Sequence, residues 1–174
     1  MLKIAITGPE STGKSRLAEG LAKHYATVFV PEFARQYIDS LNGPYTEDDL
    51  PAIARGQLQA ETLMEEQANG ILFCDTEMLV MKIWSYHKYG RCHPFILDAL
   101  QMQNHNLYLL CHIDLPWEFD PQREHPDLRE YFFGLYQKEL DGLGFRYAII
   151  DGLGETRLQN AIRAVDKVLL NSTQ

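Results

Sequence analysis

Short apolar runs alternate with longer stretches whose apolar residues recur at helical spacing. The apolar runs that fit buried strands are Leu2–Thr7, Ala26–Pro31, Ile71–Cys74, Leu107–Ile113 and Tyr147–Ile150. The stretches with helical spacing are Lys14–His24, Glu47–Asn69, Met78–Tyr89, Pro94–His105, His125–Leu143 and Glu155–Leu170. This alternation predicts an α/β fold with a five-stranded, mainly parallel sheet and helices on both faces.

The chain length fits one domain with a single core, because 174 residues is a usual domain size. We therefore expect a single domain over residues 1–174. Ligands of such sheets bind at the carboxyl ends of the strands. The polar segment 119–127 contains Pro121 and Pro126, and we expect it to be a mobile lid over that edge.

Residues Gly8–Ser15 match the phosphate-loop pattern G-x-x-x-x-G-K-[ST] at every fixed position, between the first strand and the first helix. Such a loop points successive backbone N–H groups at a phosphate, with a helix dipole behind them. Lys14 is expected to reach the β and γ phosphates, and Ser15 to offer its hydroxyl to Mg²⁺. The loop therefore predicts a P-loop NTPase fold. Its expected nucleotide-binding residues are Gly8, Glu10, Ser11, Thr12, Gly13, Lys14 and Ser15.

Charge and hydropathy narrow the choice of partners. The formal net charge of -8 disfavours a permanent nucleic-acid surface, which needs clustered Lys and Arg. A basic leader with an apolar core is absent at the start of the sequence, and its apolar runs are shorter than a membrane span. We expect a cytoplasmic protein that acts on a small molecule, with no nucleic-acid or membrane partner and an undefined oligomeric state.

The cysteines Cys74, Cys92 and Cys111 are odd in number, and no two form a C-x-x-C pair. Their histidine neighbours, His93 and His112, are directly adjacent and so lack metal-ligand spacing. We expect three reduced thiols, two of them inside strands.

Two carboxylates follow predicted strands and should share the edge that carries the phosphate loop. Our first choice is Glu32 as the base that accepts the proton of an attacking hydroxyl and Asp75 as the carboxylate on the Mg²⁺ side, although the roles could be exchanged. Ordinary pKa values would leave both ionised near neutrality. The alternatives are an N-cap role for Asp75 before Met78 and a surface ion pair between Glu32 and Arg35.

Arg123 lies in the expected lid and Arg129 just beyond it. Arginines on a closing lid can place positive charge on a migrating phosphoryl group only when both substrates are bound, which suppresses ATP hydrolysis. Each could instead be a solvated charge on a polar loop. As candidate catalytic residues we therefore count Lys14, Glu32, Asp75, Arg123 and Arg129.

Aromatic residues gather in the segments expected on the acceptor side, and stacking on them would suit a flat heterocycle. They are Phe33, Tyr37, Trp84, Tyr86, Tyr89 and Trp117. Core packing explains most of them better. Trp84 lies at helical spacing from Val80, on an apolar face of the predicted helix. A place in the core and a place in the ligand pocket fit this position equally well.

Beyond the phosphate loop, four further segments appear in order: PEFAR at 31–35, DTE at 75–77, YGRCHPF at 89–95 and PWEFDPQR at 116–123. With them the chain resembles the ribosylnicotinamide kinase domain of NadR-type proteins over nearly its whole length. The resemblance implies ATP and Mg²⁺ as cofactors and γ-phosphoryl transfer to the 5′-hydroxyl of nicotinamide riboside, which gives nicotinamide mononucleotide for NAD synthesis. The expected acceptor-side residues are Glu32, Phe33, Arg35, Asp75 and Trp84, and the expected metal-side residues are Ser15 and Asp75.

Two positions depart from that pattern, since Tyr is expected where Phe33 stands and Gly where Pro121 stands. Such proteins usually carry an adenylyltransferase domain before the kinase, and we expect none in this chain. The acceptor could therefore be nicotinamide riboside, another nucleoside or a small polyol. A nucleotide-binding switch without an acceptor is the alternative from a different class, although the sequence has no N-K-x-D segment to recognise guanine.

Overall fold

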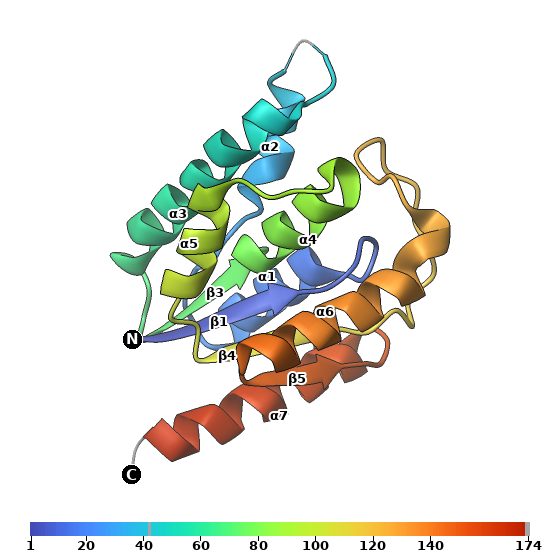
Figure 1. The fold of residues 1–174 in the computed structure, drawn as a ribbon. Coiled ribbons are helices and arrows are strands. Elements are labelled where there is room, and N and C mark those ends of the chain that lie inside the picture. The colour runs from blue at the N-terminus through green and yellow to red at the C-terminus, as the bar shows by residue number, and fades with distance from the viewer. Residues whose placement is uncertain (42, 173–174) are drawn as a thin grey trace.

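The computed structural model describes residues 1–41 and 43–172, and a parallel sheet of five strands forms its centre (Figure 1). The strands are β1 (Leu2–Thr7), β2 (Phe29–Val30), β3 (Ile71–Asp75), β4 (Leu107–Cys111) and β5 (Tyr147–Ile150). They lie in the order β2-β3-β1-β4-β5, and each neighbouring pair is parallel. The predicted α/β fold with its five-stranded sheet is confirmed.

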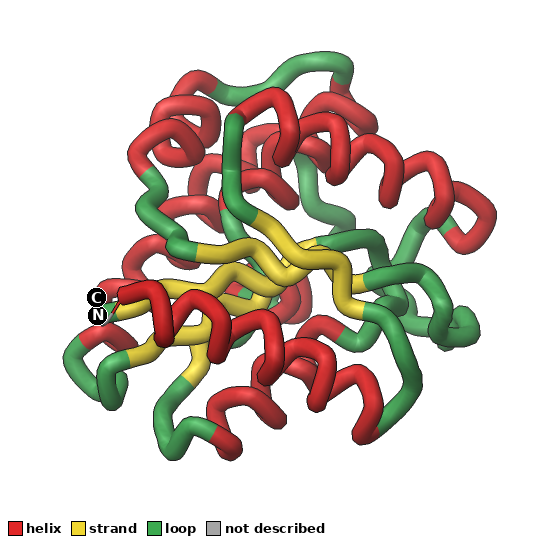
Figure 2. Tube along the Cα trace, turned by 90° about the horizontal axis from the view of Figure 1, so that it is seen from below, coloured by secondary structure: helices red, strands yellow, loops and turns green. Residues whose placement is uncertain are grey.

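Helices cover both faces of the sheet (Figure 2). One face packs against α1 (Lys14–His24) and α7 (Glu155–Ser172). The other face packs against α2 (Phe33–Asp39), α3 (Leu50–Glu65), α4 (Met78–Tyr89), α5 (Pro94–Met102) and α6 (Arg129–Leu143), with short 3₁₀ turns η1 (Glu47–Asp49) and η2 (Pro126–Leu128) before α3 and α6. Within the described ranges, none of these helices has the length and apolarity needed to cross a membrane.

Strand β1 shows why the sheet strands are apolar runs rather than alternating sequences. Ile4 and Ile6 point to the α1 and α7 face, whereas Ala5 between them packs on the opposite face. All three are fully buried, because helices exclude water from both sides. A strand segment buried on both faces needs apolar residues, and Ile4–Ile6 of β1 meet that requirement, whereas Lys3 near the start of the strand is only partly buried.

The largest difference from the predicted elements lies around the second strand. The predicted strand at 26–31 shrinks to Phe29–Val30, since Ala26 has a positive φ of 51° and sits in the turn that ends α1. Helix α2 then begins directly after Glu32 and was not predicted. Its seven residues give too little periodicity to stand out beside a strand signal.

The helix ends also differ from the predicted bounds. The predicted helices at 47–69 and 125–143 begin as η1 and η2, and η1 carries a capping box between Thr46 and Asp49. The predicted helix at 94–105 ends at Met102, because Gln103 takes an extended backbone conformation. His105 therefore lies in a loop just before β4.

The parallel sheet delivers four chemically distinct segments to one edge. The phosphate loop follows β1, Glu32 follows β2, Asp75 ends β3, and the lid segment lies in the connection between β4 and α6. Because all of these strands run in the same direction, their carboxyl ends meet at that edge. The fold therefore gathers these candidate residues although they are far apart in the sequence.

Candidate functional site

A cavity of about 390 Å³ lies at the carboxyl edge of the sheet. One side is the whole phosphate loop, from Gly8 to Ser15. Glu32, Arg35 and Trp84, from the start of α2 and from α4, line the part of the cavity outside the loop, and the connection between β4 and α6 contributes Arg123. The cavity thus has a phosphate-binding wall and a separate wall on which a second molecule can lie.

The phosphate loop has the backbone conformation that its glycines permit. Gly8 has a φ of 132° and Gly13 a φ of 75°, values that side chains with a Cβ rarely adopt. The Lys14 Nζ donates hydrogen bonds to the carbonyl oxygens of Gly8 and Pro9 at 3.0 and 2.8 Å. The ammonium group therefore lies against the inner side of the loop, where the phosphates of a nucleotide would bind.

Gly8→Ala is expected to destabilise the protein by about 1 to 3 kcal/mol. An added Cβ would lie 3.0 Å from the carbonyl oxygen of Cys111 and 3.3 Å from its amide nitrogen, and the φ of Gly8 would be strained. The matched control is Gly134→Ala in α6, where an added Cβ meets nothing within 4 Å and alanine favours the helix. Urea unfolding of both variants checks this, and equal stabilities would contradict it.

Asp75 is buried beside the phosphate loop, with 1% of its surface exposed, and its Oδ1 has no hydrogen-bond partner among the described residues. Burial raises the pKa of Asp75 to about 6, and the nearby charge of Glu32 adds to the rise. A hydrogen bond from the Ser15 side chain and the charge of Lys14 oppose that rise in pKa. Asp75 remains mostly ionised at neutral pH, as a carboxylate with one unpartnered oxygen.

Helix α4 is capped by Glu77, so the alternative N-cap role for Asp75 is wrong. The Glu77 carboxylate accepts hydrogen bonds from the Leu79 amide at 2.5 Å and from the Thr7 hydroxyl at 3.0 Å. Glu77 is fully buried, and this burial raises its pKa to about 7. Asp75 is therefore left free of a capping role. It lies behind Ser15, next to the cavity, and is not itself part of the cavity wall among the described residues.

Thr76, between these two carboxylates, is a site residue that the sequence did not reveal. Its φ of 75° places a β-branched residue in the left-handed region, which is strained. The amide of Thr76 donates to the Ile6 carbonyl at 3.2 Å, while its hydroxyl is buried without a hydrogen-bond partner and lines the cavity. Backbone strain of this kind persists where the surrounding structure holds a functional turn in place. No pattern in the sequence predicts the strained conformation of Thr76.

Glu32 lines the cavity from the start of α2, where it is the N-cap residue by backbone geometry. The ion pair predicted as an alternative role for Glu32 is not found within the described ranges. The guanidinium of Arg35 instead pairs with Asp120 of the lid segment, at 2.8 Å from Nη1 to Oδ2. The Glu32 carboxylate therefore faces the cavity without an ion-pair partner among the described residues.

The predicted lid segment, residues 119–127, contacts both α2 and the phosphate loop. The Gln122 side chain donates to the Asp39 carboxylate of α2 at 2.6 Å. The Glu10 carboxylate of the phosphate loop accepts the amides of Glu124 and His125 at 3.1 and 3.2 Å. Glu10 thus links the phosphate loop to the lid segment. The phosphate-loop pattern in the sequence did not predict this contact.

The two candidate arginines converge on Ser11 of the phosphate loop. Arg123 donates to the Ser11 hydroxyl at 3.4 Å and to the Glu118 carbonyl, and Arg129 donates to the Ser11 carbonyl at 3.3 Å. Both guanidinium groups lie near the Trp117 ring, 6.0 and 5.9 Å from its centroid. Both are half-buried, so neither is a freely solvated charge.

The aromatic residues divide between cavity and core. Trp84 lines the cavity and stacks on Tyr45, with centroids 5.5 Å apart and planes 5° from parallel. Phe33 packs against Gly56 of α3, where an added Cβ would meet the Phe33 ring at 2.0 Å. Among the described residues Phe33 is not part of the cavity wall. The structure therefore brings Trp84, but not Phe33, to the acceptor side.

Stability is expected to fall by about 1 to 2 kcal/mol as the pH rises from 6.5 to 8 in metal-free buffer. Burial raises the pKa values of Glu61 and Glu77 to about 7, so the folded protein holds protons that the unfolded chain has already lost. Those protons are released through this pH window at a cost to the folded state. Urea titrations check the slope, and a stability that rises over this window would contradict it. Glu61→Gln should lower the slope by roughly half, since Glu77 remains, whereas Glu19→Gln, an exposed substitution in α1, should leave it unchanged.

A phosphate loop between the first strand and the first helix of a parallel sheet in this strand order defines a P-loop nucleotide-binding domain. Sequence comparison then gives the family, because the model of the AAA domain family matches residues 3–157. The chain belongs to this family.

Curated relatives show the likeness predicted from the motifs. The chain is 31% identical over 124 residues to the trifunctional NAD biosynthesis/regulator protein NadR of Escherichia coli K12, and equally to NadR of Salmonella typhimurium LT2. Each alignment covers 69% of this chain and 30% of the relative. The chain therefore spans less than a third of the length of these relatives, and the predicted resemblance to NadR-type proteins is confirmed.

Solved structures share the fold. A NadR protein in complex with NR superimposes with a TM-score of 0.83 at 23% identity, over 96% of this chain and 49% of that chain. A deoxyadenosine kinase from M. mycoides superimposes with a TM-score of 0.64 at 12% identity, over 95% of this chain and all of that chain. The chain therefore shares the fold of both solved structures.

Proposed function

We propose that this protein transfers the γ-phosphoryl group of ATP to a nucleoside hydroxyl, with nicotinamide riboside as the preferred acceptor and nicotinamide mononucleotide as the product. The observation that carries the proposal is the single cavity with a phosphate loop on one wall and Glu32, Arg35 and Trp84 on the other. The likeness to NadR supports the choice of acceptor.

The residues on the phosphate wall suit ATP with Mg²⁺. Gly8 and Gly13 let the backbone approach the phosphates, and Lys14 offers positive charge from the inner side of the loop. Ser15 and the unpartnered Asp75 oxygen would hold Mg²⁺, since hydroxyl and carboxylate oxygens are its preferred ligands. Bound Mg²⁺ would supply charge neutralisation for the phosphates.

Glu32 is the better candidate for the base, and Asp75 for the metal side. Asp75 lies next to Ser15 of the phosphate loop and is almost completely buried. Glu32 lies on the cavity wall without a side-chain hydrogen bond to the described residues, so it can accept a proton from a hydroxyl bound there. The two carboxylates thus have separate tasks set by their positions.

The lid segment would complete the site around the reacting groups. Arg123 and Arg129 reach Ser11 from this side, so their charge lies next to the loop that would bind the phosphates. The contacts of Glu10 with the lid segment hold it against the loop, where it would limit the access of water to bound phosphates. This arrangement favours transfer to a bound acceptor over hydrolysis.

On the acceptor wall, Trp84 offers a flat apolar surface already held in place by Tyr45. A nicotinamide or nucleobase ring can stack on such a surface, with a contribution of about 1 to 3 kcal/mol. The hydroxyl missing at Phe33 does not weaken this argument, because the Phe33 ring packs on Gly56 in the core. Acceptor choice therefore rests on Trp84 and Arg35.

The test is an acceptor panel under single-turnover conditions with ATP and Mg²⁺, comparing nicotinamide riboside with the common ribonucleosides and deoxyribonucleosides. Mass spectrometry identifies the products. Nicotinamide mononucleotide as the product formed with the highest kcat/KM supports the proposal. A higher kcat/KM for another nucleoside would overturn the acceptor assignment while leaving the kinase chemistry in place.

A further inference from the structure

Three residues that the proposed reaction does not use meet on the face of the sheet covered by α3. They are Glu61 of α3, Cys74 of β3 and His105 of the loop before β4. One ligand atom from each, a carboxylate oxygen, the thiol sulfur and an imidazole nitrogen, lies within 4.8 Å of the other two. The three residues, called here the Glu61–Cys74–His105 cluster, come from separate segments of the chain.

The cluster is buried, and three of its polar atoms lack hydrogen-bond partners among the described residues, although the His105 Nε2 lies 4.0 Å from the Glu61 Oε2. Only 6% of the Glu61 side chain and 1% of the His105 side chain are exposed, and Cys74 is fully buried. Neither ring nitrogen of His105 nor the Oε1 of Glu61 makes a hydrogen bond to the described residues. Buried polar groups without partners are rare and costly, so their gathering at one point calls for a ligand that satisfies them together.

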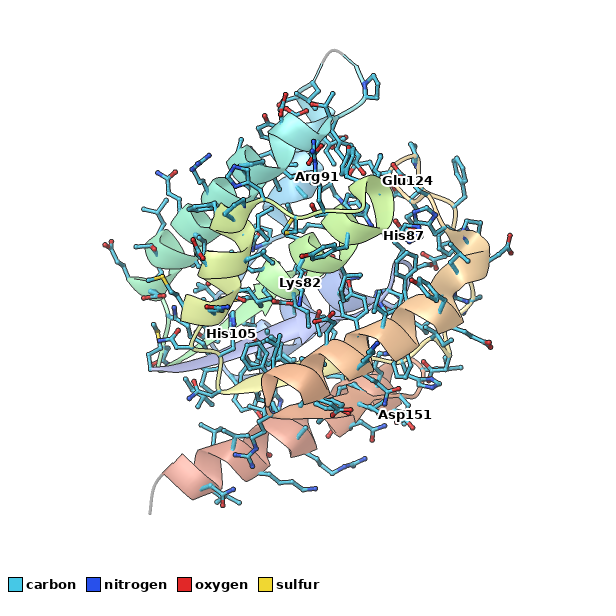
Figure 3. The ribbon with its side chains drawn as sticks, in the orientation of Figure 1. Lys82, His87, Arg91, His105, Glu124 and Asp151 are labelled. Atoms are coloured by element: carbon cyan, nitrogen blue, oxygen red, sulfur yellow. The ribbon has the colours of Figure 1, made fainter. Side chains whose placement is uncertain are left out.

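The position of the cluster separates it from the proposed active site. Figure 3 shows His105 beside the amino-terminal end of β1, whereas Glu124 of the lid segment lies on the opposite side of the molecule. None of the three cluster residues lines the 390 Å³ cavity. A ligand of the cluster would therefore not compete with the substrates.

We propose that the Glu61–Cys74–His105 cluster is a binding site for one zinc ion, which stabilises the fold when bound. A thiolate, an imidazole and a carboxylate form a donor set that suits zinc better than Mg²⁺ or Ca²⁺, which prefer oxygen ligands alone. Three protein ligands leave a fourth tetrahedral position for water. Zinc ligands lie roughly 3.3 to 3.7 Å apart at bond lengths of about 2.0 to 2.3 Å, so small side-chain rotations would close the site.

Binding requires the loss of one proton from the Cys74 thiol and of a second proton wherever Glu61 is protonated, while His105 binds as the neutral imidazole. Burial lowers the pKa of His105 to about 4, which keeps the ring neutral at physiological pH. Burial raises the pKa values of Cys74 and Glu61, so zinc must displace protons there and its affinity should increase with pH.

The charged neighbours permit a cation in the cluster. Lys3 is the basic group that acts on Glu61, Cys74 and His105, and its ammonium is paired with Glu65. Tyr108 packs edge-on against His105 and has a buried hydroxyl without a hydrogen-bond partner. Zinc bound by a thiolate and a carboxylate would carry no net charge, so its burial beside the Lys3–Glu65 pair costs little.

The test uses untagged protein grown with cobalt in place of zinc, stripped of weakly bound ions in the presence of excess Mg²⁺. One cobalt per chain with the near-ultraviolet absorption of a cobalt–thiolate bond supports the site. Tetrahedral d–d bands would confirm the geometry. Protein that holds less than a tenth of an equivalent of cobalt or zinc, or that binds it without the thiolate band, would overturn the proposal.

Two variants test the ligands, and a third serves as the control. Cys74→Ser should abolish the thiolate band, and Glu61→Gln should weaken metal retention at least tenfold while its similar shape preserves the fold. Cys92→Ser removes a half-buried thiol outside the cluster and should leave band and stoichiometry unchanged. If Cys74→Ser does not fold, Glu61→Gln decides: metal retention equal to that of the unaltered chain would overturn the site. Chelator should also lower the Tm of the unaltered chain, but not that of Glu61→Gln.

Discussion

Lys14→Ala is expected to lower kcat/KM for phosphoryl transfer by roughly 10³-fold while leaving the fold intact. The Lys14 ammonium is the charged group on the inner side of the phosphate loop, and its loss removes charge stabilisation where the transferred group would lie. Its contacts to the protein are two backbone carbonyls at the loop, so the free energy of unfolding should change by no more than about 1 to 2 kcal/mol.

The matched control is Lys23→Ala, an exposed lysine in the last turn of the same helix. It removes the same charge from the chain and should retain full activity. Steady-state kinetics and urea unfolding of both variants separate loss of chemistry from loss of structure. Transfer by Lys14→Ala within tenfold of the unaltered protein would contradict the role of the loop.

Glu32→Gln and Asp75→Asn are expected to impair transfer in different ways. Glu32→Gln removes the proposed base and should lower kcat by roughly 10² to 10⁴-fold, with the Mg²⁺ requirement unchanged. Asp75→Asn removes the unpartnered carboxylate beside Ser15 and should raise the Mg²⁺ concentration needed for half-maximal rate by at least about tenfold. Rates measured across a Mg²⁺ titration distinguish the two effects.

The opposite pattern, with a shifted Mg²⁺ requirement in Glu32→Gln alone, would exchange the two roles. Unchanged rates in both variants would remove carboxylate assistance from the mechanism. Glu19→Gln in α1 serves as the control, since this exposed carboxylate lies outside the cavity wall and should not alter the rate.

The order of the fold was predictable because its strands are short apolar runs, and the central strands β3, β1 and β4 are buried on both faces. Strands β1 and β5 and helices α1 and α4 have the predicted bounds, since apolar runs and helical spacing are strong signals over these segments. Helix α2 was missed because it is short and starts directly after a strand. Because parallel strands end at the same edge of the sheet, their order was enough to predict that the candidate site residues meet there.

Site residues were predictable from the sequence where the local backbone or chemistry requires one residue type. The phosphate loop is such a case, since its glycines meet backbone requirements that no other residue meets well. The pairing of Arg35 with Asp120, the capping by Glu77 and the strained Thr76 depend on contacts between distant segments. Sequence spacing carries no information about such contacts, and for the same reason it did not reveal that Cys74 and His105 meet.

The measurement that tests the central claim most directly is ADP formation from ATP and Mg²⁺ with and without nicotinamide riboside. The proposed kinase holds its arginines and lid segment for transfer to a bound acceptor, so ADP formation should rise at least about 100-fold when the acceptor is added. Steady ADP formation at the same rate in both reactions would contradict the account and favour a nucleotide-binding switch.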